Sequence, residues 1–413
     1  MINRINRIQV FEHQSLIIGR QYDGLLFTEK HFSALVKLND LFKNQYFTII
    51  HRGVKFTQYV GVVQIDDLCI EILPKLDNST NDKAQWQSAL IEMLRVTKRL
   101  SVANVGDANV NKQNVHLLDI FFDLFLTEVD ILKRRGLIKK YRFETENTFA
   151  LKGKIQFAKH ITANLAHQER FYNSHLVYDY DHLIHQVFSV ALDIIESMSG
   201  GNALFAKCKS TRLDFPDVKA INVNIVTFSK IEKSRKTAPY ERALEIARLI
   251  IMNYAPNVKH GKEKMIALLF DMNVLWEEYV FYRLKSFANE EVKVKSQVSR
   301  AFWRGVSIRP DIVIETRNNE MYIIDTKWKN LMAGKPSTHD LRQMYVYNEY
   351  WGAIKSLLLY PSVNSSQPHF SNFENKCDGD VTHQCGIGFV SIFNQDSSRL
   401  NREIGKEILG FFL

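Results

Sequence analysis

The stretch IIDTKWK, residues 323–329, changes abruptly from the apolar start of a buried strand to a run of charged side chains. Side chains alternate between the two faces of a strand, so Asp325 and Lys327 project from the same face as Ile323. An acid and a base on one strand face form either a salt bridge or a reaction centre. The stretch therefore predicts a sheet strand that ends in a charged cluster.

The residues before this strand predict its partner. The sequence RPDIVIETRNNEMY, residues 309–322, has the pattern of a second strand and a polar turn, and asparagine tolerates the left-handed conformation that closes a hairpin. With a three-residue loop Asp311 lies opposite Asp325, whereas a two-residue loop pairs Asp311 with Thr326 and places Asp325 one step diagonal. Opposite residues have Cβ atoms about 4.5 to 5.5 Å apart. Two carboxylates this close repel unless a divalent cation joins them, and oxygen ligands suit Mg²⁺ or Mn²⁺.

A third carboxylate comes from a predicted helix, DMNVLWEEYVFYRLKSFA, residues 271–288. At 100° per residue, Glu277 lies in the middle of an apolar arc, and Glu278 lies toward the polar side and solvent. A carboxylate on an apolar face is costly unless a metal, a cation or hydrogen bonds satisfy it, so the alternatives are a metal ligand and a buried salt bridge. Beside such a metal, Lys327 would orient a water molecule and stabilise charge on a phosphate, which is the chemistry of phosphodiester hydrolysis.

A second predicted helix, STHDLRQMYVYNEYW, residues 337–351, follows the strand and has Ser337 or Thr338 as its N-cap. Gln343 and Tyr347 stand at i and i+4 on one helical face. Two roles remain open for this pair. They contact the lysine or the nucleic-acid backbone, or they are purely structural.

The whole chain of 413 residues, 46% of them hydrophobic, predicts an α+β protein of several domains. Residues 1–80 alternate apolar and polar positions between turn formers, which indicates a β-rich N-terminal domain. Residues 81–265 are mainly helical, with strands expected near 143–157 and 211–229. From 266 to 413 helices and strands alternate, which predicts an α/β domain with a central mixed sheet.

Charge and composition narrow the class of function. The formal net charge is +9, and an excess of Lys and Arg favours polyanion partners. The most apolar run, residues 117–132, contains four acidic residues, so it predicts an amphipathic helix, and no membrane partner is expected. The N-terminus has no signal-peptide pattern and the four cysteines form no disulfide framework. A cytoplasmic protein is expected.

Several of these residues resemble known families. Asp311 with Asp325-Thr326-Lys327, a preceding Glu277 and the later Gln343-x-x-x-Tyr347 resemble the PD-(D/E)xK nuclease superfamily. Further stretches resemble one family, the McrC subunit of the modified-cytosine-dependent McrBC restriction system, over about residues 55–355. They are IEILPK (70–75), LKRRGLIKKYRFETENTFALKGKIQFAKHI (132–161), LLFDMNVLWEEYV (268–280) and IIDTKWK (323–329).

The resemblance implies that residues 266–413 form a restriction-endonuclease-like domain that cuts double-stranded DNA with Mg²⁺. Asp311, Asp325 and Lys327 would be catalytic with Glu277 assisting, and the three carboxylates would bind the metal. It also implies an McrB-like AAA+ GTPase ring that reads the modified cytosine, with residues 1–80 docking in the ring and stimulating GTP hydrolysis. The chain has no G-x-x-x-x-G-K-[ST] phosphate loop, as this division of labour requires.

The alternative is a non-catalytic adaptor whose nuclease-like fold only binds DNA or regulates the motor. Retention of both aspartates and the lysine favours the enzyme, because a degenerate site would be free to lose one charge and relieve the repulsion.

Overall fold

The computed structural model describes most of the chain, namely residues 6–76, 82–100, 116–256, 264–329, 335–374, 383–394 and 399–412. The chain divides into two compact units. One unit contains Met1–Asn6, Gln64–Asp67 and Leu118–Leu268, and the other contains Arg7–Val63, Leu68–Leu117 and Leu269–Leu413. The β-rich start of the chain and the region after residue 268 therefore belong to the same unit.

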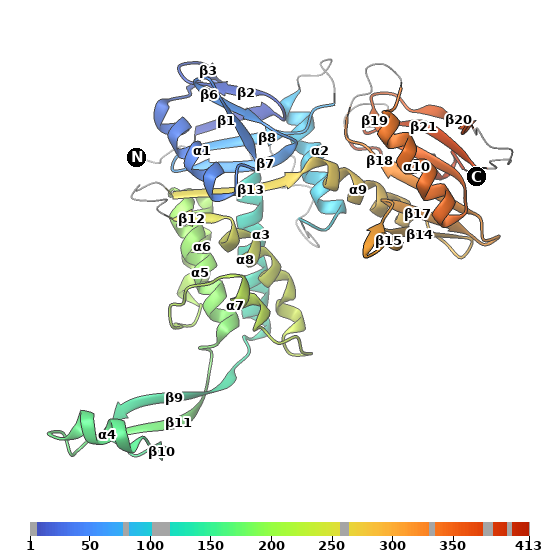
Figure 1. Cartoon of the computed structure of the whole chain (residues 1–413). Coiled ribbons are helices and arrows are strands. Elements are labelled where there is room, and N and C mark those ends of the chain that lie inside the picture. The colour runs from blue at the N-terminus through green and yellow to red at the C-terminus, as the bar shows by residue number, and fades with distance from the viewer. Residues whose placement is uncertain are drawn as a thin grey trace. The chain divides into compact units, whose positions relative to one another are not determined.

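The first unit is built on a group of helices (Figure 1). They are α3 (Leu117–Arg135), α5 (Leu183–Met198), α6 (Ala203–Leu213), α7 (Ile225–Ser229) and α8 (Glu241–Met252). A 3₁₀ turn at Ala238–Tyr240 precedes α8, and the short strand β12 (Tyr254–Pro256) follows it. The amphipathic helix expected over residues 117–132 is confirmed. The strand expected near 211–229 is wrong. That stretch contains the end of α6, an irregular segment with Pro216, which cannot donate to a sheet, and α7.

An arm leaves these helices. It consists of β9 (Lys140–Thr148), β10 (Lys154–Ile155), α4 (Phe157–Asn164) and β11 (Phe171–Asp179), with β9 and β11 paired antiparallel along their whole length. Figure 1 shows it extending well beyond the helices of its unit. More than half of each of nine large apolar side chains on the arm is exposed: Tyr141, Phe143, Phe149, Leu151, Phe157, Ile161, Leu165, Leu176 and Tyr178. Such a concentration on a surface is typical of an interaction site.

The beginning of the second unit is mostly β, as the sequence predicted. Its strands are β1 (Asn6–Phe11), β2 (Ser15–Ile17), β3 (Gln21–Tyr22), β4 (Leu25–Leu26), β5 (Phe47–Ile50), β6 (Gly53–Phe56), β7 (Tyr59–Ile65) and β8 (Leu68–Leu73). β8 lies between β1 and β7 in one sheet and is buried along its whole length. Helix α1 (Glu29–Leu41) interrupts the strands, and α2 (Lys83–Val96) follows them.

The rest of the second unit contains a six-stranded sheet in the order β14-β17-β18-β19-β21-β20. Its strands are β14 (Val292–Ser296), β17 (Ile312–Thr316), β18 (Met321–Thr326), β19 (Ala353–Ser362), β20 (Ser366–Asn372) and β21 (Gln384–Ser391). β18 pairs antiparallel with β17 and parallel with β19, so the mixed sheet expected from the sequence is confirmed. β13 (Lys264–Asp271) and α9 (Met272–Ser286) precede this sheet, and α11 (Ile404–Leu409) follows it.

Helix α10 (Thr338–Trp351) makes the crossover between the parallel strands β18 and β19, as such pairs require. Ser337 caps its N-terminus, and Gly352, with φ of 61°, ends it in the left-handed conformation. One face of the sheet packs against this helix through a buried core that includes Val313, Ile323, Leu358, Met344 and Trp351. Because side chains on a strand alternate, Asp325 continues the row of Ile323 on this covered face.

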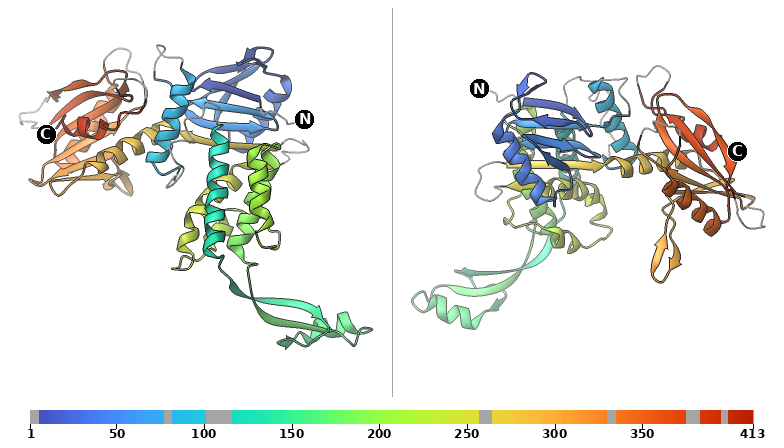
Figure 2. Two further views of the ribbon diagram at one scale, coloured as in Figure 1. Left: turned by 180° about the vertical axis from the view of Figure 1, so that it is seen from behind. Right: turned by 45° about the horizontal axis from the view of Figure 1, so that its top comes forward.

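A two-stranded ribbon outside the main sheet was not expected from the sequence. It consists of β15 (Arg300–Trp303) and β16 (Val306–Ile308), lies between β14 and β17 in the chain, and projects from the domain in the right-hand view of Figure 2.

Candidate active site

The hairpin of β17 and β18 sets the positions of the two aspartates. Ile312 pairs with Ile324, and the loop holds the three residues 317–319, the last of them in the left-handed conformation with φ of 61°. Continued by one position, this register sets Asp311 opposite Asp325. Of the two loops considered from the sequence, the structure has the three-residue one.

Both aspartates are held in a largely buried environment. One oxygen of Asp311 accepts hydrogen bonds from the backbone N–H and the hydroxyl of Thr326, at 2.7 and 2.9 Å. Asp325 is only 2% exposed. Burial raises the pKa of Asp311, and burial together with the negative charge of Asp311 raises the pKa of Asp325. The pair therefore resists full ionisation unless positive charge lies beside it.

Lys327 supplies such a charge from the residue after β18. Its Nζ lies 2.7 Å from Oδ2 of Asp325 and 3.7 Å from Oδ1 of Asp340. Burial acts to lower the pKa of Lys327, but the negative charges of Asp325, Asp340 and Asp311 outweigh it and raise this pKa. The side chain is a protonated cation at neutral pH, suited to stabilising negative charge rather than to accepting a proton.

Asp340 is a member of the cluster that the sequence reasoning missed. Its backbone N–H donates to the Ser337 hydroxyl at the start of α10, and its carboxylate lies 3.0 Å from Nζ of Lys329. Burial acts to raise the pKa of Asp340, but the bonds from Lys329 and Ser337 and the charge of Lys327 outweigh it and lower that pKa. Its position three residues after the N-cap was the available signal, because an acid there is typical of a capped helix start.

Glu277 faces this cluster from α9. Gln297 donates a hydrogen bond to Oε1 of Glu277 at 2.7 Å. Burial, followed by the negative charge of Asp311, raises the pKa of Glu277 to about 7. Glu278 has a different partner. The sequence predicted that it faces solvent, but in the structure it is paired with a cation. Both of its oxygens accept from Arg99, at 2.6 and 2.7 Å.

A cavity of about 300 Å³ opens beside the two glutamates. Thr97, Lys98 and Arg99, at the end of α2, contribute to its wall together with Gln297. The site thus has a polar, partly basic hollow on the side of Glu277.

Gln343 and Tyr347 lie one turn apart on α10. Nε2 of Gln343 donates to the Tyr347 hydroxyl at 2.7 Å, and that hydroxyl donates to the backbone carbonyl of Arg309 at 2.9 Å. These bonds hold the segment two residues before Asp311. The geometry favours the structural alternative for this pair, because its bonds support the segment that positions an aspartate.

Trp328 connects the site to the first strand of the chain. Its indole N–H donates to Oε1 of Glu12 at 2.7 Å, and the backbone N–H of Lys75 donates to the same oxygen at 3.0 Å. Burial raises the pKa of Glu12 to about 7. The Trp328 ring also lies 5.5 Å from the ring of Trp276, the residue before Glu277. Sequence reasoning missed Glu12, since nothing local in its surroundings points to a residue so distant in the chain.

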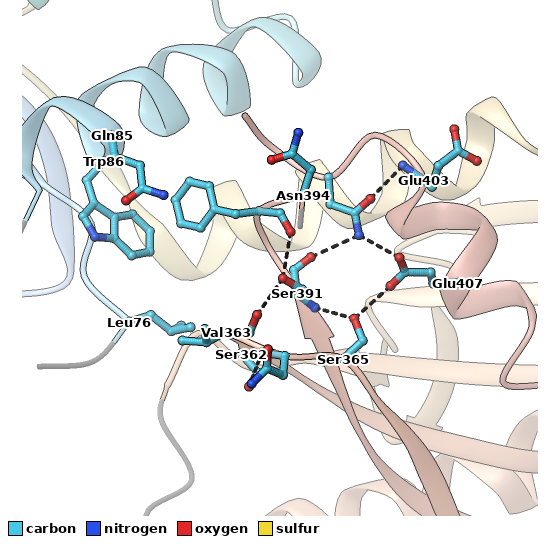
Figure 3. A pocket seen from close by; sticks show the side chains of 13 residues that line it. Leu76, Gln85, Trp86, Ser362, Val363, Ser365, Ser391, Asn394, Glu403 and Glu407 are labelled. Atoms are coloured by element: carbon cyan, nitrogen blue, oxygen red, sulfur yellow. Dashed lines mark hydrogen bonds between the residues drawn. The ribbon is translucent and has the colours of Figure 1, made fainter. Parts of the chain in front are cut away.

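A larger cavity, of about 540 Å³, lies apart from this cluster (Figure 3). Its polar wall is already internally bonded. Ser365 donates to Glu407 at 2.9 Å and accepts from the N–H of Ser391 at 2.8 Å, and Asn401 also donates to Glu407. Trp86 contributes an apolar side to the wall. These bonds stabilise the end of the sheet and indicate no particular ligand.

Two groups of side chains offer metal ligands. Cys69, Glu71 and His116 have ligand atoms within 4.8 Å of one another, but the oxygens of Glu71 already accept from the N–H of Leu117 and from two glutamines. The other group consists of the carboxylates of Glu277, Asp311 and Asp325, whose oxygens do not all lie within 4.8 Å of one another. Burial is the largest cause of the raised pKa of each of these carboxyl groups, and carboxylate oxygens are the ligands that Mg²⁺ prefers. The residues therefore fit the expected metal.

A half-buried aspartate just before β17, a buried aspartate on β18, a lysine two residues beyond it and a helical glutamate together form a site with the residue types of metal-dependent hydrolysis. The model of one family, the McrBC 5-methylcytosine restriction system component, matches residues 54–361. The chain belongs to this family. The resemblance to McrC noted in the sequence is confirmed.

Known relatives agree with this membership. The type IV methyl-directed restriction enzyme EcoKMcrBC of Escherichia coli K12 is 23% identical over 279 residues, which cover 62% of this chain and 79% of the relative. Among solved structures, a half-complex of Thermococcus gammatolerans McrB AAA+ hexamers with bound McrC contains a chain that matches with a TM-score of 0.72 at 19% identity, covering 99% of this chain and 100% of that one. A second T. gammatolerans McrBC structure matches with a TM-score of 0.51 at 20% identity, over 69% of this chain and 89% of that one.

In the described part of the chain, no helix is both long and apolar enough to cross a membrane.

Proposed function

We propose that this protein is the Mg²⁺-dependent DNA endonuclease subunit of a McrBC-type restriction complex. The observation that carries the proposal is the cluster of Asp311, Asp325 and Lys327 at the ends of paired strands, with Glu277 facing it. An adaptor would not need a buried and a half-buried aspartate whose charges repel each other. A nuclease needs them, because they hold the cation on which phosphodiester hydrolysis depends.

The roles of the residues follow from their surroundings. Asp311, Asp325 and Glu277 would hold Mg²⁺, which supplies a lowered pKa for the attacking water and charge neutralisation at the phosphate. Thr326 orients Asp311 through two hydrogen bonds. Protonated Lys327 stabilises the negative charge that develops on the phosphate oxygens. Its ion pair with Asp325 fixes the position of the lysine ammonium group.

The partner proposed for this chain is an McrB-like AAA+ GTPase ring that it stimulates. The solved relative with the higher TM-score is McrC bound to McrB AAA+ hexamers. The docking role predicted for residues 1–80 remains a prediction. The exposed apolar side chains of the arm provide a second candidate surface, because apolar groups in such numbers are normally covered by a partner.

Substitution on the arm tests this second surface. Phe143→Ser and Phe157→Ser together should weaken binding to the ring, measured with purified components, since both side chains are exposed and their loss leaves the core unchanged. Leu213→Ser, which changes a still more exposed apolar residue on α6, is the control. Unchanged affinity of the double variant for the ring would rule out the arm surface and leave residues 1–80 as the predicted docking region.

The test of the nuclease proposal is DNA cleavage by Asp325→Ala and Lys327→Ala with Mg²⁺, the partner and GTP. Each should lose at least about 10²-fold in rate, the scale of a positioned electrostatic group. Asp217→Ala and Lys236→Ala remove exposed charges of the same kind and should cut normally. Normal cutting by either site variant would remove the proposed site. A wild-type protein that stimulates the GTPase but never cuts would establish the adaptor instead.

A further inference from the structure

The ribbon of β15 and β16 has an unusually open tip. Trp303 pairs with Val306 across a two-residue turn, Arg304–Gly305, and both turn residues have positive φ, as a tight hairpin requires. Trp303 is 65% exposed and Val306 51% exposed, and every residue from 299 to 307 is exposed. The ribbon therefore presents an aromatic ring and a branched apolar side chain to its surroundings.

The ribbon is firmly held at its base. The Arg300 guanidinium lies 4.9 Å from the ring of Trp351 and donates to the backbone carbonyl of Tyr350. The Phe302 ring lies 5.3 Å from the ring of Tyr350. All three contacts are with the C-terminal end of α10, so the exposed tip stands on a fixed support.

The two ends of the ribbon meet at the candidate active site. The backbone N–H of Gln297 donates to the carbonyl of Asp311 at 2.9 Å, which closes the base of the ribbon. The Gln297 side chain bonds to Glu277. On the other strand, the carbonyl of Arg309 accepts from Tyr347. The tip is six residues from Asp311, which corresponds to about 20 Å at about 3.3 Å per residue.

The charge of the ribbon has one sign. Residues 297–310 contain three arginines and no aspartate or glutamate. The Arg304 guanidinium lies 5.8 Å from the Trp303 ring, so cation and aromatic face are presented together. This combination suits a surface of phosphates and stacked bases, because arginine pairs with phosphate and aromatic rings pack on bases and sugars.

We propose that the β15–β16 ribbon contacts duplex DNA next to the bond that is cut, and this inference rests on the proposed nuclease function. Arg304 and Arg309 bind backbone phosphates, and Trp303 packs into the groove against sugar or base faces. A two-stranded ribbon fits the major groove of B-form DNA, and its fixed base relates the depth of insertion to the position of the aspartates. The ribbon thus sets the register of the duplex on the site.

Photocrosslinking identifies what covers the tip. A benzophenone amino acid replaces Trp303 in the full chain, which is assembled with the motor partner, GTP and a labelled duplex in Mg²⁺. The same amino acid at Leu213, an exposed position in the other unit, is the control. Crosslinks from position 303 to the duplex, and not from position 213, are expected. Crosslinks from position 303 to the motor protein instead, or to neither, would overturn the proposal.

Affinity provides a second measurement that does not depend on cleavage. Binding of the labelled duplex to the assembled complex is measured in EDTA. Trp303→Ala should weaken it about tenfold or more, Trp303→Phe should retain most of it because a ring remains, and Leu213→Ala should leave it unchanged. Equal affinities for Trp303→Ala and wild type would refute the ribbon's role. Failure of the nuclease proposal would appear differently, as a wild-type complex that binds DNA and does not cut it.

Discussion

Glu277 and Glu278 are adjacent, and the structure gives them different partners, so a pair of matched substitutions tests the role proposed for Glu277. Glu277 faces Asp311 and Gln297, whereas Glu278 is held by Arg99. Glu277→Gln should reduce single-turnover cleavage by about 10² or more, because it removes a negative charge from the proposed metal position. Glu278→Gln should change the cleavage rate little.

The stability of the metal-free protein should move in the opposite direction from its activity. The pKa of Glu277 rises from 4.5 to about 7, so the ionised carboxylate opposes folding. A difference of this size corresponds to about 3 kcal/mol, which solvent screening of the partly exposed side chain reduces to about 1 kcal/mol. Because the folded pKa is the higher one, this cost is absent below about pH 4.5, grows as the pH rises, and is complete above about pH 7.

Urea unfolding in EDTA measures this difference. Glu277→Gln should be more stable than wild type by about 1 kcal/mol at pH 8 and equal to it at pH 4. Glu278→Gln loses an ion pair and should be equal or slightly less stable at both pH values. Equal cleavage by the two variants, or a greater loss in Glu278→Gln, would mean that α9 presents the other glutamate to the site. A less stable Glu277→Gln at pH 8 would refute the electrostatic reasoning.

Three further outcomes are expected. Asp340→Asn should lower the cleavage rate by about tenfold to 10²-fold, because Lys327 and Lys329 lose a shared negative partner. Glu349→Gln on the same helix serves as the control. Equal cleavage rates in the two variants would exclude Asp340 from the site. Tyr347→Phe should lower the free energy of unfolding in urea by about 1 kcal/mol and slow cleavage by about tenfold or more. The reason is that it removes the hydrogen bond to the Arg309 carbonyl, two residues before Asp311. A variant that is less stable but fully active would show that the tyrosine does not contribute to catalysis. Mg²⁺ should raise the melting temperature of the wild-type protein and not that of Asp311→Asn, and EDTA should stop cleavage; an equal thermal shift in both would place the metal elsewhere.

Local patterns predicted the parts of the site that depend on local geometry. The alternation around Asp325 and the polar turn at residues 317–319 were enough to set Asp311 opposite it, and the mixed sheet followed from the order of strands and helices. The arc of α9 assigned different surroundings to Glu277 and Glu278, and their partners do differ, but both side chains are half-buried and line the same cavity, and the arc did not reveal Arg99 as the partner of Glu278. Each of these features depends on residues close together in the sequence.

What escaped prediction depends on contacts between distant segments or on unusual strands. The β15–β16 ribbon has almost no buried face, so the alternation of apolar and polar residues that marks a strand is missing from it. Strands β9 and β10 lie near the strands expected around 143–157, but β11 was not expected, because 22 residues separate it from β9 and both of its faces are partly exposed. Asp340 was missed although it lies only 13 positions from Lys327, because nothing in the sequence shows that the start of α10 lies beside the end of β18.

The hydrogen bond between Trp328 and Glu12 spans 316 positions of the chain. During synthesis the N-terminal strand emerges long before the tryptophan that completes its buried carboxylate, so the candidate site acquires its final form only near the end of translation. For the same reason the last third of the chain is a poor choice for separate expression, because its indole N–H would lose the acceptor that the first strand provides.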